Sequence, residues 1–277
     1  MIIFPNCKIN LGLNVLNRRK DGYHELQTFY YPLPFTDVLE VIQQNNKENC
    51  SADIEFSVSG IDIETNAENN LCSKAYQLLK KDFPSMPALQ MYLHKNIPPG
   101  AGLGGGSTDG AFTLKLLNQK FQLGLTDVNL LEYAIQLGSD CPFFIINKPC
   151  HATGRGEILE TTDLDLSAYT FVLVIPPIHS STAHAFSLIQ PRRQEKPIKE
   201  IIQQPVVSWK NELQNDFEEP LFNEYPELKS IKEQLYDSGA NYASLTGSGS
   251  TVFGLFKKLM EPQFNFPENY LVKYLPG

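Results

Sequence analysis

The amino-acid sequence predicts an α+β fold of two domains. Strand-like and helix-like segments are mixed along the chain without a regular β-α-β rhythm, which argues against a doubly wound parallel sheet. The chain has 277 residues, of which 42% are hydrophobic, so it is long enough for two domains that each bury a core. Because the composition shifts near residues 149–153, we predict one domain over residues 1–152 and a second over residues 153–277.

The first part of the chain is predicted to hold five strands and two helices. Apolar residues alternate with polar or small ones over residues 9–15, which is typical of a half-buried strand. Similar patterns predict strands over residues 26–33, 37–42, 51–60 and 89–93. Asn70 can cap a helix whose apolar residues recur at helical spacing, and a second helix follows a glycine-rich segment.

The remaining chain alternates helices and strands. Thr126 is predicted to cap a helix over residues 127–137, with Gly138 at its C′ position. A buried strand is predicted over residues 171–175, and residues 190–208 are polar and proline-rich, which predicts an irregular surface segment. Further predictions are a helix over 227–237 and two strands, over 242–245 and 251–256, on either side of a glycine turn.

Charge and cysteine content restrict the partners. The net charge of −8 disfavours nonspecific binding to nucleic acid or anionic membranes. No apolar run approaches the ~20 residues that span a bilayer. The five cysteines, an odd number without a C-x-x-C pair, predict neither a disulfide framework nor a zinc site. We therefore expect a cytoplasmic protein that acts on a small molecule, with no membrane, nucleic-acid or obligate protein partner.

A glycine loop is the feature with the clearest chemistry. Glycines allow positive φ angles and let a ligand touch the main chain, so successive N–H groups can surround an anion. A helix follows directly, and its N-terminus also favours a phosphate. The hydroxyl of Ser107 could reach a phosphate or a Mg²⁺ ion. The predicted phosphate-binding residues are Pro98, Pro99, Gly100, Ala101, Gly102, Leu103, Gly104, Gly105, Gly106, Ser107 and Thr108.

Several known loops do not fit this segment. A Walker A loop needs a lysine before the Ser-Thr pair, and this loop has none. The glycine spacing differs from the dinucleotide fingerprint, and the H-R-D and D-F-G motifs of protein kinases are absent. A flexible linker remains an alternative, although the flanking strand and helix disfavour it.

Three segments resemble the motifs of the GHMP kinases, the family of galactokinase, homoserine kinase, mevalonate kinase and phosphomevalonate kinase. They are residues 5–13, the glycine loop, and residues 245–250 (LTGSGS), and they occur in the family's order. The resemblance implies a two-domain GHMP-kinase-like fold with the active site in the cleft between the domains. It also implies an ATP-dependent small-molecule kinase.

Within the family, three strings resemble the members that phosphorylate a cytidine diphosphate-linked methylerythritol. They are residues 7–13 (CKINLGL), 21–28 (DGYHELQT) and 137–144 (LGSDCPFF). The resemblance implies transfer of the ATP γ-phosphoryl group, with Mg²⁺ as cofactor, to the 2-hydroxyl of the methylerythritol part. This reaction belongs to the non-mevalonate pathway to isoprenoid precursors.

The same resemblance implies the catalytic pair Lys8 and Asp140. Taken alone, Lys8 is typical of an edge lysine at the start of a strand, and Asp140 of a turn residue before Cys141-Pro142. Spacing cannot show that they meet. If they do, Asp140 can accept the proton of the attacking hydroxyl, and the ammonium of Lys8 keeps the carboxylate ionised.

The other implied site residues belong to the two substrates. Tyr23 and His24 are expected to hold the cytosine by stacking and polar contact, with Phe186 on the second face of the base. Taken alone, Tyr23 and His24 read as a turn aromatic and a solvated histidine. The remaining residues are placed by the resemblance: Asn10, Gly247 and Ser248 near the acceptor, and Asn70 and Lys95 near the adenine.

Three rival functions remain open at this point. Another GHMP specificity, such as homoserine or mevalonate phosphorylation, is disfavoured by the Tyr23-His24 string. A catalytically silent protein of the same fold, acting as a binding or regulatory module, is disfavoured by the presence of both Lys8 and Asp140. A nonenzymatic anion-binding domain would require the three motifs to coincide by chance.

Overall fold

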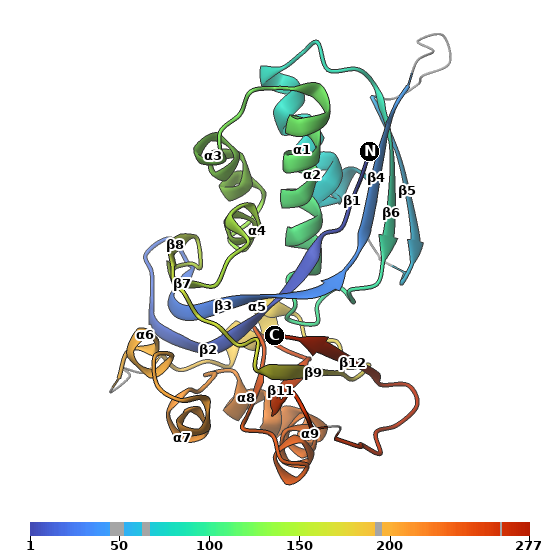
Figure 1. Ribbon diagram of the computed structural model, residues 1–277. Coiled ribbons are helices and arrows are strands. Elements are labelled where there is room, and N and C mark those ends of the chain that lie inside the picture. Colours follow the sequence, from blue (N-terminus) through green and yellow to red (C-terminus); the bar gives the residue numbers. More distant parts are fainter. Residues whose placement is uncertain (45–52, 63–66, 192–195, 261) are drawn as a thin grey trace. The chain divides into compact units, whose positions relative to one another are not determined.

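The chain forms two compact units, each assembled from separate stretches of sequence. A computed structural model describes residues 1–44, 53–62, 67–191, 196–260 and 262–277 (Figure 1). Unit 1 consists of residues 1–7, 35–99 and 104–147, and unit 2 of residues 8–34, 100–103 and 148–277. These units differ from the linear division predicted after residue 152, because two early stretches of the chain group with the C-terminal part.

Unit 1 contains a four-stranded sheet in the order β1-β4-β6-β5. β6 pairs antiparallel with β4 and parallel with β5. Side chains alternate along β6, where Leu89, Met91 and Leu93 are buried and Tyr92 is exposed. This is the period-two pattern from which the strand was predicted. The strands are β1 (Ile2–Ile3), β4 (Val38–Gln43), β5 (Ile54–Gly60) and β6 (Leu89–Lys95).

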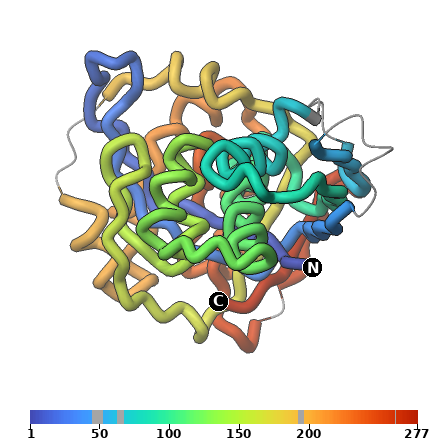
Figure 2. The backbone as a smooth tube through the Cα atoms, turned by 90° about the horizontal axis from the view of Figure 1, so that it is seen from above, coloured from blue at the N-terminus to red at the C-terminus, as the bar shows by residue number. Residues whose placement is uncertain are grey.

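Helix α2 is the centre of the helical layer of unit 1. It contacts α1, α3 and α4, and Figures 1 and 2 show it among these helices. The predicted N-caps are confirmed, since Asn70 Oδ1 accepts from Cys72 N at 2.9 Å and Thr126 forms a capping box with Asn129. The helices are η2 (Ala67–Asn69), α1 (Leu71–Asp82), α2 (Gly105–Phe121), α3 (Asp127–Leu137) and α4 (Cys141–Ile146).

Gly138 differs from its prediction. It ends α3 with φ 167°, which is extended backbone, so it does not use the left-handed conformation expected of a C′ glycine.

Unit 2 is built mainly from two four-stranded sheets, in the orders β2-β3-β7-β8 and β10-β11-β9-β12. In the second sheet, β9 lies between β11 and β12 and pairs antiparallel with both. The first residues of β2, up to Cys7, and the last residues of β3, from Phe35, belong to unit 1. The strands are β2 (Asn6–Arg18), β3 (His24–Thr36), β7 (Cys150–Gly154), β8 (Ile158–Thr161), β9 (Tyr169–Ile175), β10 (Tyr242–Leu245), β11 (Val252–Lys257) and β12 (Leu271–Pro276).

Short helices supply the rest of unit 2. Its core joins Leu245 and Phe256 of the sheet to Phe217, Leu221 and Leu235 of the helices and their flanks. The helical elements are α5 (Thr182–Ser187), α6 (Ile198–Ile201), η3 (Val206–Ser208), α7 (Trp209–Glu212), α8 (Glu218–Glu224) and α9 (Pro226–Asp237).

The prediction of an irregular surface segment over residues 190–208 is wrong in part. It contains α6 and η3, and Ile198, Ile201 and Ile202 are buried. Isoleucines three and four residues apart form one apolar stripe, even on a single helical turn. Residues 192–195 of this segment, like residues 51–52 of a predicted strand, lie outside the described part of the chain.

Four cysteines, Cys7, Cys72, Cys141 and Cys150, are buried free thiols. The fifth, Cys50, lies outside the described residues. A search of the described residues found no helix that combines the length and the apolar character needed to cross a membrane.

Candidate active site

The glycine loop uses the backbone freedom of its glycines. Gly100, Gly102 and Gly104 have φ angles of 70°, 77° and 73°. These values lie in the left-handed region, which residues with a Cβ atom rarely adopt. Gly104 is the N-cap of α2 and offers no side chain to the first amides of that helix. Those amides have no partners within the helix, so an anion can accept from them.

Parts of all three predicted motifs meet around Gly102 in unit 2. The carbonyl oxygen of Gly102 accepts from Lys8 Nζ at 3.0 Å and from Thr246 Oγ1 at 3.2 Å. Lys8 Nζ also donates to Asn10 Oδ1 at 2.6 Å, and the Asn10 amide donates to Thr246 Oγ1 at 3.0 Å. Lys8 is 3% exposed, so its charge lies in a buried polar network. Lys8 and Asn10 of β2 are therefore joined within one unit.

The glycine turn of the third motif is held by hydrogen bonds from the side chain of Asn215. Asn215 Nδ2 donates to the carbonyls of Leu245 and Gly247, at 2.9 Å in each case. Gly247 has φ 56°, and Ser248 Oγ lies 3.3 Å from Thr182 Oγ1. Asn215 thus orients the turn that carries Gly247 and Ser248.

Lys95 lies in a buried ion cluster of unit 1. Its Nζ donates to Asp109 Oδ2 at 2.7 Å and to Asp37, and it is 3% exposed. A Cβ on Gly105 would lie 3.4 Å from this Nζ, so the cluster lies against the first turn of α2. Its ammonium is therefore held by two carboxylates, and any effect of Lys95 on a nucleotide would act through the start of this helix.

Burial and neighbouring charges shift the pKa values of Asp109 and Lys95. Burial raises the pKa of Asp109 to about 8, although Lys95 opposes the rise. Burial also opposes the charge on Lys95, but the two carboxylates outweigh it and raise the pKa of that lysine. Asp37 accepts from the amides of Asn96 and Ile97, at 2.6 and 2.9 Å. Burial and the nearby carboxyl group of Asp37 thus disfavour the charge on Asp109, whereas Lys95, which donates to both carboxyl groups, keeps its charge.

Asp140 occupies the N-cap position of α4 in unit 1. Its side chain makes no capping hydrogen bond to the backbone amides of the helix. The next residue, Cys141, hydrogen-bonds with the side chain of Ser107, and burial raises the pKa of its thiol to about 12, so the thiol stays protonated. Because Lys8 belongs to unit 2, its pairing with Asp140 stays a prediction.

Hydroxyl groups are the metal-binding candidates near the loop. Ser107 lies in the first turn of α2, and the next residue, Thr108, has a buried hydroxyl without a hydrogen-bond partner. Across the described residues, no group of three or more His, Cys, Asp and Glu side chains could hold a metal ion. Mg²⁺ commonly takes most of its ligands from phosphates and water, so Ser107 fits as a single protein ligand beside a nucleotide.

Two predicted cytosine-binding residues contact each other in unit 2. The rings of His24 and Phe186 are stacked, with centroids 4.9 Å apart and planes inclined by 17°. Phe186 is also edge-on to the buried ring of Phe217, which anchors it in the core. Burial lowers the pKa of His24, with a further contribution from Arg18. A neutral imidazole presents one donor and one acceptor.

Tyr23 is exposed and has a cation beside its ring. The guanidinium carbon of Arg155 lies 4.8 Å from the ring centroid, within the range of a cation–π contact. Arg155 Nε donates to Glu157 Oε1 at 3.2 Å, which fixes the guanidinium. Tyr23 is therefore oriented by a residue of the β7–β8 turn.

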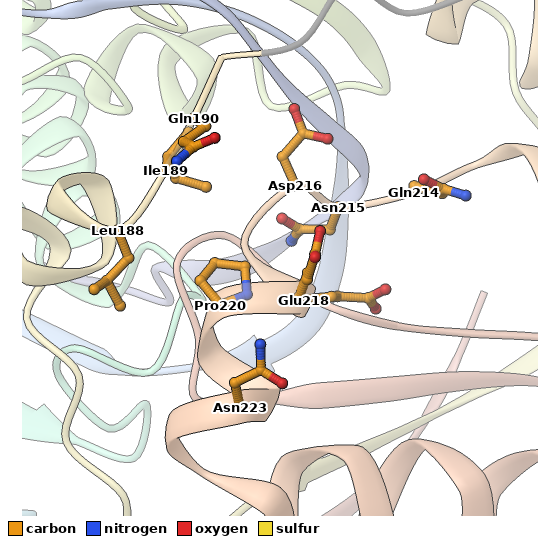
Figure 3. A pocket seen from close by; sticks show the side chains of 10 residues that line it. Leu188, Ile189, Gln190, Gln214, Asn215, Asp216, Glu218, Pro220 and Asn223 are labelled. Atoms are coloured by element: carbon orange, nitrogen blue, oxygen red, sulfur yellow. The ribbon is translucent and has the colours of Figure 1, made fainter.

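A polar pocket of about 360 Å³ lies beyond the end of α5 in unit 2 (Figure 3). None of the predicted site residues lines it. Two of its carboxylates serve the fold, since Asp216 accepts from Val15 N at 2.7 Å and Glu218 accepts from Lys232 at 2.7 Å. The pocket is lined by Leu188, Ile189, Gln190, Gln214, Asn215, Asp216, Glu218, Glu219, Pro220 and Asn223.

Sequence reasoning missed several residues of this site. Thr246 was part of a quoted motif without a role, and its hydroxyl joins Asn10 to the glycine loop. Asp37 and Asp109 are two further residues, and a carboxylate within a run of apolar strand or helix residues is a signal of a buried ion pair. Arg155 gave no local signal, because nothing in its own segment indicates a neighbour in the Tyr23 turn.

Comparison with known proteins places these features in one family. The GHMP kinases N terminal domain matches residues 70–148, and the GHMP kinases C terminal domain matches residues 198–264. A protein named 4-diphosphocytidyl-2-C-methyl-D-erythritol kinase from Bacteroides fragilis (strain YCH46) is 52% identical over 256 residues, which are 92% of each chain. The protein of that name from Cytophaga hutchinsonii is 46% identical over 97% of this chain and 96% of its own length.

Solved structures give the same result. A crystal structure of 4-(cytidine 5'-diphospho)-2C-methyl-D-erythritol kinase has a TM-score of 0.79 and 28% identity, and the match covers 100% of both chains. A crystal structure of mevalonate kinase has a TM-score of 0.73 over 100% of this chain and 98% of its own, and at 13% identity it shows the fold alone. The predicted α+β GHMP-kinase fold is confirmed, and this chain is a kinase that belongs to the GHMP kinase family.

Proposed function

We propose that this kinase transfers the γ-phosphoryl group of ATP to the 2-hydroxyl of 4-diphosphocytidyl-2-C-methyl-D-erythritol. The observation that carries the proposal is the aromatic pair of His24 and Phe186 beside Tyr23, in a chain whose curated relatives bear that substrate's name. A polyol without a nucleotide has no ring to stack, whereas cytosine does. The aromatic group therefore favours this acceptor over mevalonate or homoserine.

The proposed chemistry uses one carboxylate and one ammonium. The oxygen of the 2-hydroxyl forms a bond to the γ-phosphorus while Asp140 accepts the hydroxyl proton. The bond between the γ-phosphorus and the oxygen that bridges it to the β-phosphate breaks, which releases ADP. Lys8 stabilises the ionised carboxylate and the developing charge on the attacking oxygen. Because the transition state of phosphoryl transfer is loose, positioning and charge neutralisation supply most of the rate.

The proposed donor site is the glycine loop. The left-handed glycines and the N-terminal amides of α2 provide N–H groups for the ATP phosphates. A Mg²⁺ ion, when bound beside the hydroxyl of Ser107, would neutralise phosphate charge. Asn70 is proposed near the adenine, and its position at the N-cap of α1 fixes its side chain. Lys95 is proposed to support the start of α2 from within its ion cluster.

Cytosine recognition requires a change in the aromatic group. One face of Phe186 is covered by His24 in this structure, so a base that enters between Tyr23 and Phe186 displaces the histidine ring. The displaced neutral imidazole can then donate to and accept from the polar edge of the base.

Replacing Phe186 with alanine is expected to raise the KM for the cytidylyl substrate about tenfold or more. Base–aromatic stacking contributes about 1–3 kcal/mol. The KM for ATP should change less than about twofold, since Phe186 is proposed to contact the acceptor alone. Steady-state kinetics with each substrate varied in turn measures both values.

Phe222→Ala is the matched control for this variant. Both rings are partly buried and pack on the same hydrophobic core of unit 2, so both variants lose a similar apolar contact. The control should leave the KM of the acceptor unchanged. An equal rise in both substrate KM values for Phe186→Ala would count against the cytosine assignment.

The substrate itself is tested by ADP release coupled to a detection enzyme. Purified protein is assayed with ATP and, in parallel, 4-diphosphocytidyl-2-C-methyl-D-erythritol, homoserine and mevalonate. We expect turnover with the first acceptor and a kcat/KM that is lower by roughly a hundredfold or more with the other two. The reason is that a site built for the cytosine base keeps unpaired polar groups when the acceptor has no base. Comparable turnover of mevalonate or homoserine would refute the proposal.

A further inference from the structure

Helix α4 depends on its neighbours for its orientation. It has six residues, and isolated helices shorter than ~12–15 residues are marginal in water. Asp140 is its N-cap residue, so the direction of the carboxylate follows the direction of this helix. Whatever holds α4 therefore also positions Asp140.

Lys115 of α2 holds the C-terminal end of α4. Its Nζ donates to the carbonyl oxygens of Phe144 and Ile145, at 3.3 and 3.0 Å. The last carbonyls of a helix have no partners within it, and a cation there also stabilises the helix dipole. The ammonium lies 5.1 Å from the ring centroid of Phe112, and burial lowers its pKa. The charge thus faces the C-terminal carbonyls of α4 and one aromatic ring, and Asp127 of α3 favours it electrostatically.

Ser107 of the same helix holds the other end. Its side chain hydrogen-bonds with Cys141, the first residue of α4. Ser107 and Lys115 are eight residues apart, so they lie on one face of α2 and about 12 Å apart along its axis. One helix therefore fixes both ends of α4, and that helix begins in the glycine loop.

We propose that Lys115 is a positioning residue for phosphoryl transfer, which fixes α4 on α2 so that Asp140 keeps a constant place relative to the first turn of α2. The proposal rests on the proposed role of Asp140 as the base. It assigns Lys115 no contact with either substrate.

Packing alone does not explain a lysine at this position. A half-buried ammonium loses part of its hydration, and an apolar side chain of similar volume, such as methionine, avoids that loss. Methionine cannot donate to the carbonyls of Phe144 and Ile145, so it would leave the last turn of α4 unattached. The lysine thus fits a requirement for orientation of this helix.

The test compares Lys115→Met and Lys115→Arg with Lys120→Met. We expect Lys115→Met to lower kcat about tenfold to a hundredfold, since displacements near 1 Å in a catalytic group can cost about 10²-fold. The KM for ATP should stay within about twofold. Lys115→Arg keeps N–H donors for the carbonyls of Phe144 and Ile145, so it should retain roughly a third or more of the wild-type kcat. Lys120, whose Nζ lies over the Phe121 ring, controls for loss of a cation from α2.

A second measurement separates orientation from stability. Lys115→Ala should regain kcat when a small alkylamine such as methylammonium is added, because the amine can occupy the vacated site and donate to the same carbonyls. Its thermal unfolding midpoint should not track this recovery. Normal kcat in Lys115→Met, or equal losses in kcat and ATP affinity, would overturn the proposal. Asp140→Asn is assayed in parallel, and its near-normal turnover would instead refute the proposed base.

Discussion

Asparagine in place of Asp140 is expected to lower kcat by about two to four orders of magnitude, the usual contribution of a general base. The carboxamide has the size of the carboxylate but cannot accept a proton at neutral pH. Because Asp140 makes no capping hydrogen bond to the amides of α4, the substitution removes no helix cap. The KM for ATP should therefore remain within about twofold of the wild type, as for an interaction made in the transition state.

Single-turnover kinetics with ATP and the cytidylyl substrate measures this effect on the chemical step. Asp127→Asn is the control, since Asp127 is an exposed carboxylate in the first turn of α3 in the same unit. It should retain wild-type kcat and lose at most about 1 kcal/mol of stability, from its interaction with the helix dipole. Near-normal turnover of Asp140→Asn would rule out this residue as the base.

Gly102→Ala is expected to lower the free energy of unfolding by about 3 kcal/mol or more and kcat/KM by at least a hundredfold (roughly). A Cβ at this position would lie 2.1 Å from the carbonyl oxygen of Thr246, which is backbone and cannot turn aside. The residue also has φ 77°. Separating the two segments would break the hydrogen bonds that Lys8 and Thr246 donate to the Gly102 carbonyl.

Gly124→Ala separates the two causes of this loss. Gly124 has a similar φ of 73°, but an added Cβ would meet no atom within 4 Å. This control should show backbone strain alone, about 1–2 kcal/mol, with unchanged kcat/KM. Denaturant unfolding and steady-state kinetics of both variants make the comparison. Equal destabilisation of the two would contradict the role of the Gly102–Thr246 approach.

Local signals predicted most elements of the fold. Helix caps and strand alternation depend on residues that are close in sequence, so they can be predicted from it directly. Examples are the caps at Asn70 and Thr126 and the alternating residues of β6. The glycine loop was predictable for the same reason, because positive φ angles are a property of single residues. Motif order then indicated the family.

Contacts between distant segments were not predictable in this way. Lys95 was expected near the adenine, and its partners Asp37 and Asp109 lie 58 and 14 residues away in sequence. The same holds for the stack of His24 on Phe186, where sequence suggested two sides of a base rather than two rings in contact. Short helices such as α4 and α6 were not predictable from the sequence either, because one or two turns show too little hydrophobic periodicity.

The hydrogen bond that Lys95 donates to Asp109 has a consequence for the energetics of nucleotide binding at the proposed site. The two residues flank the glycine loop in sequence, one before Pro98 and one after Thr108, and Lys95 Nζ lies 2.7 Å from Asp109 Oδ2. The ends of the loop are therefore already joined when the chain folds, and the entropy of closing it is lost at that stage. An ATP molecule in the proposed site would then need to order less of the backbone, and more of its contact energy would be retained as affinity.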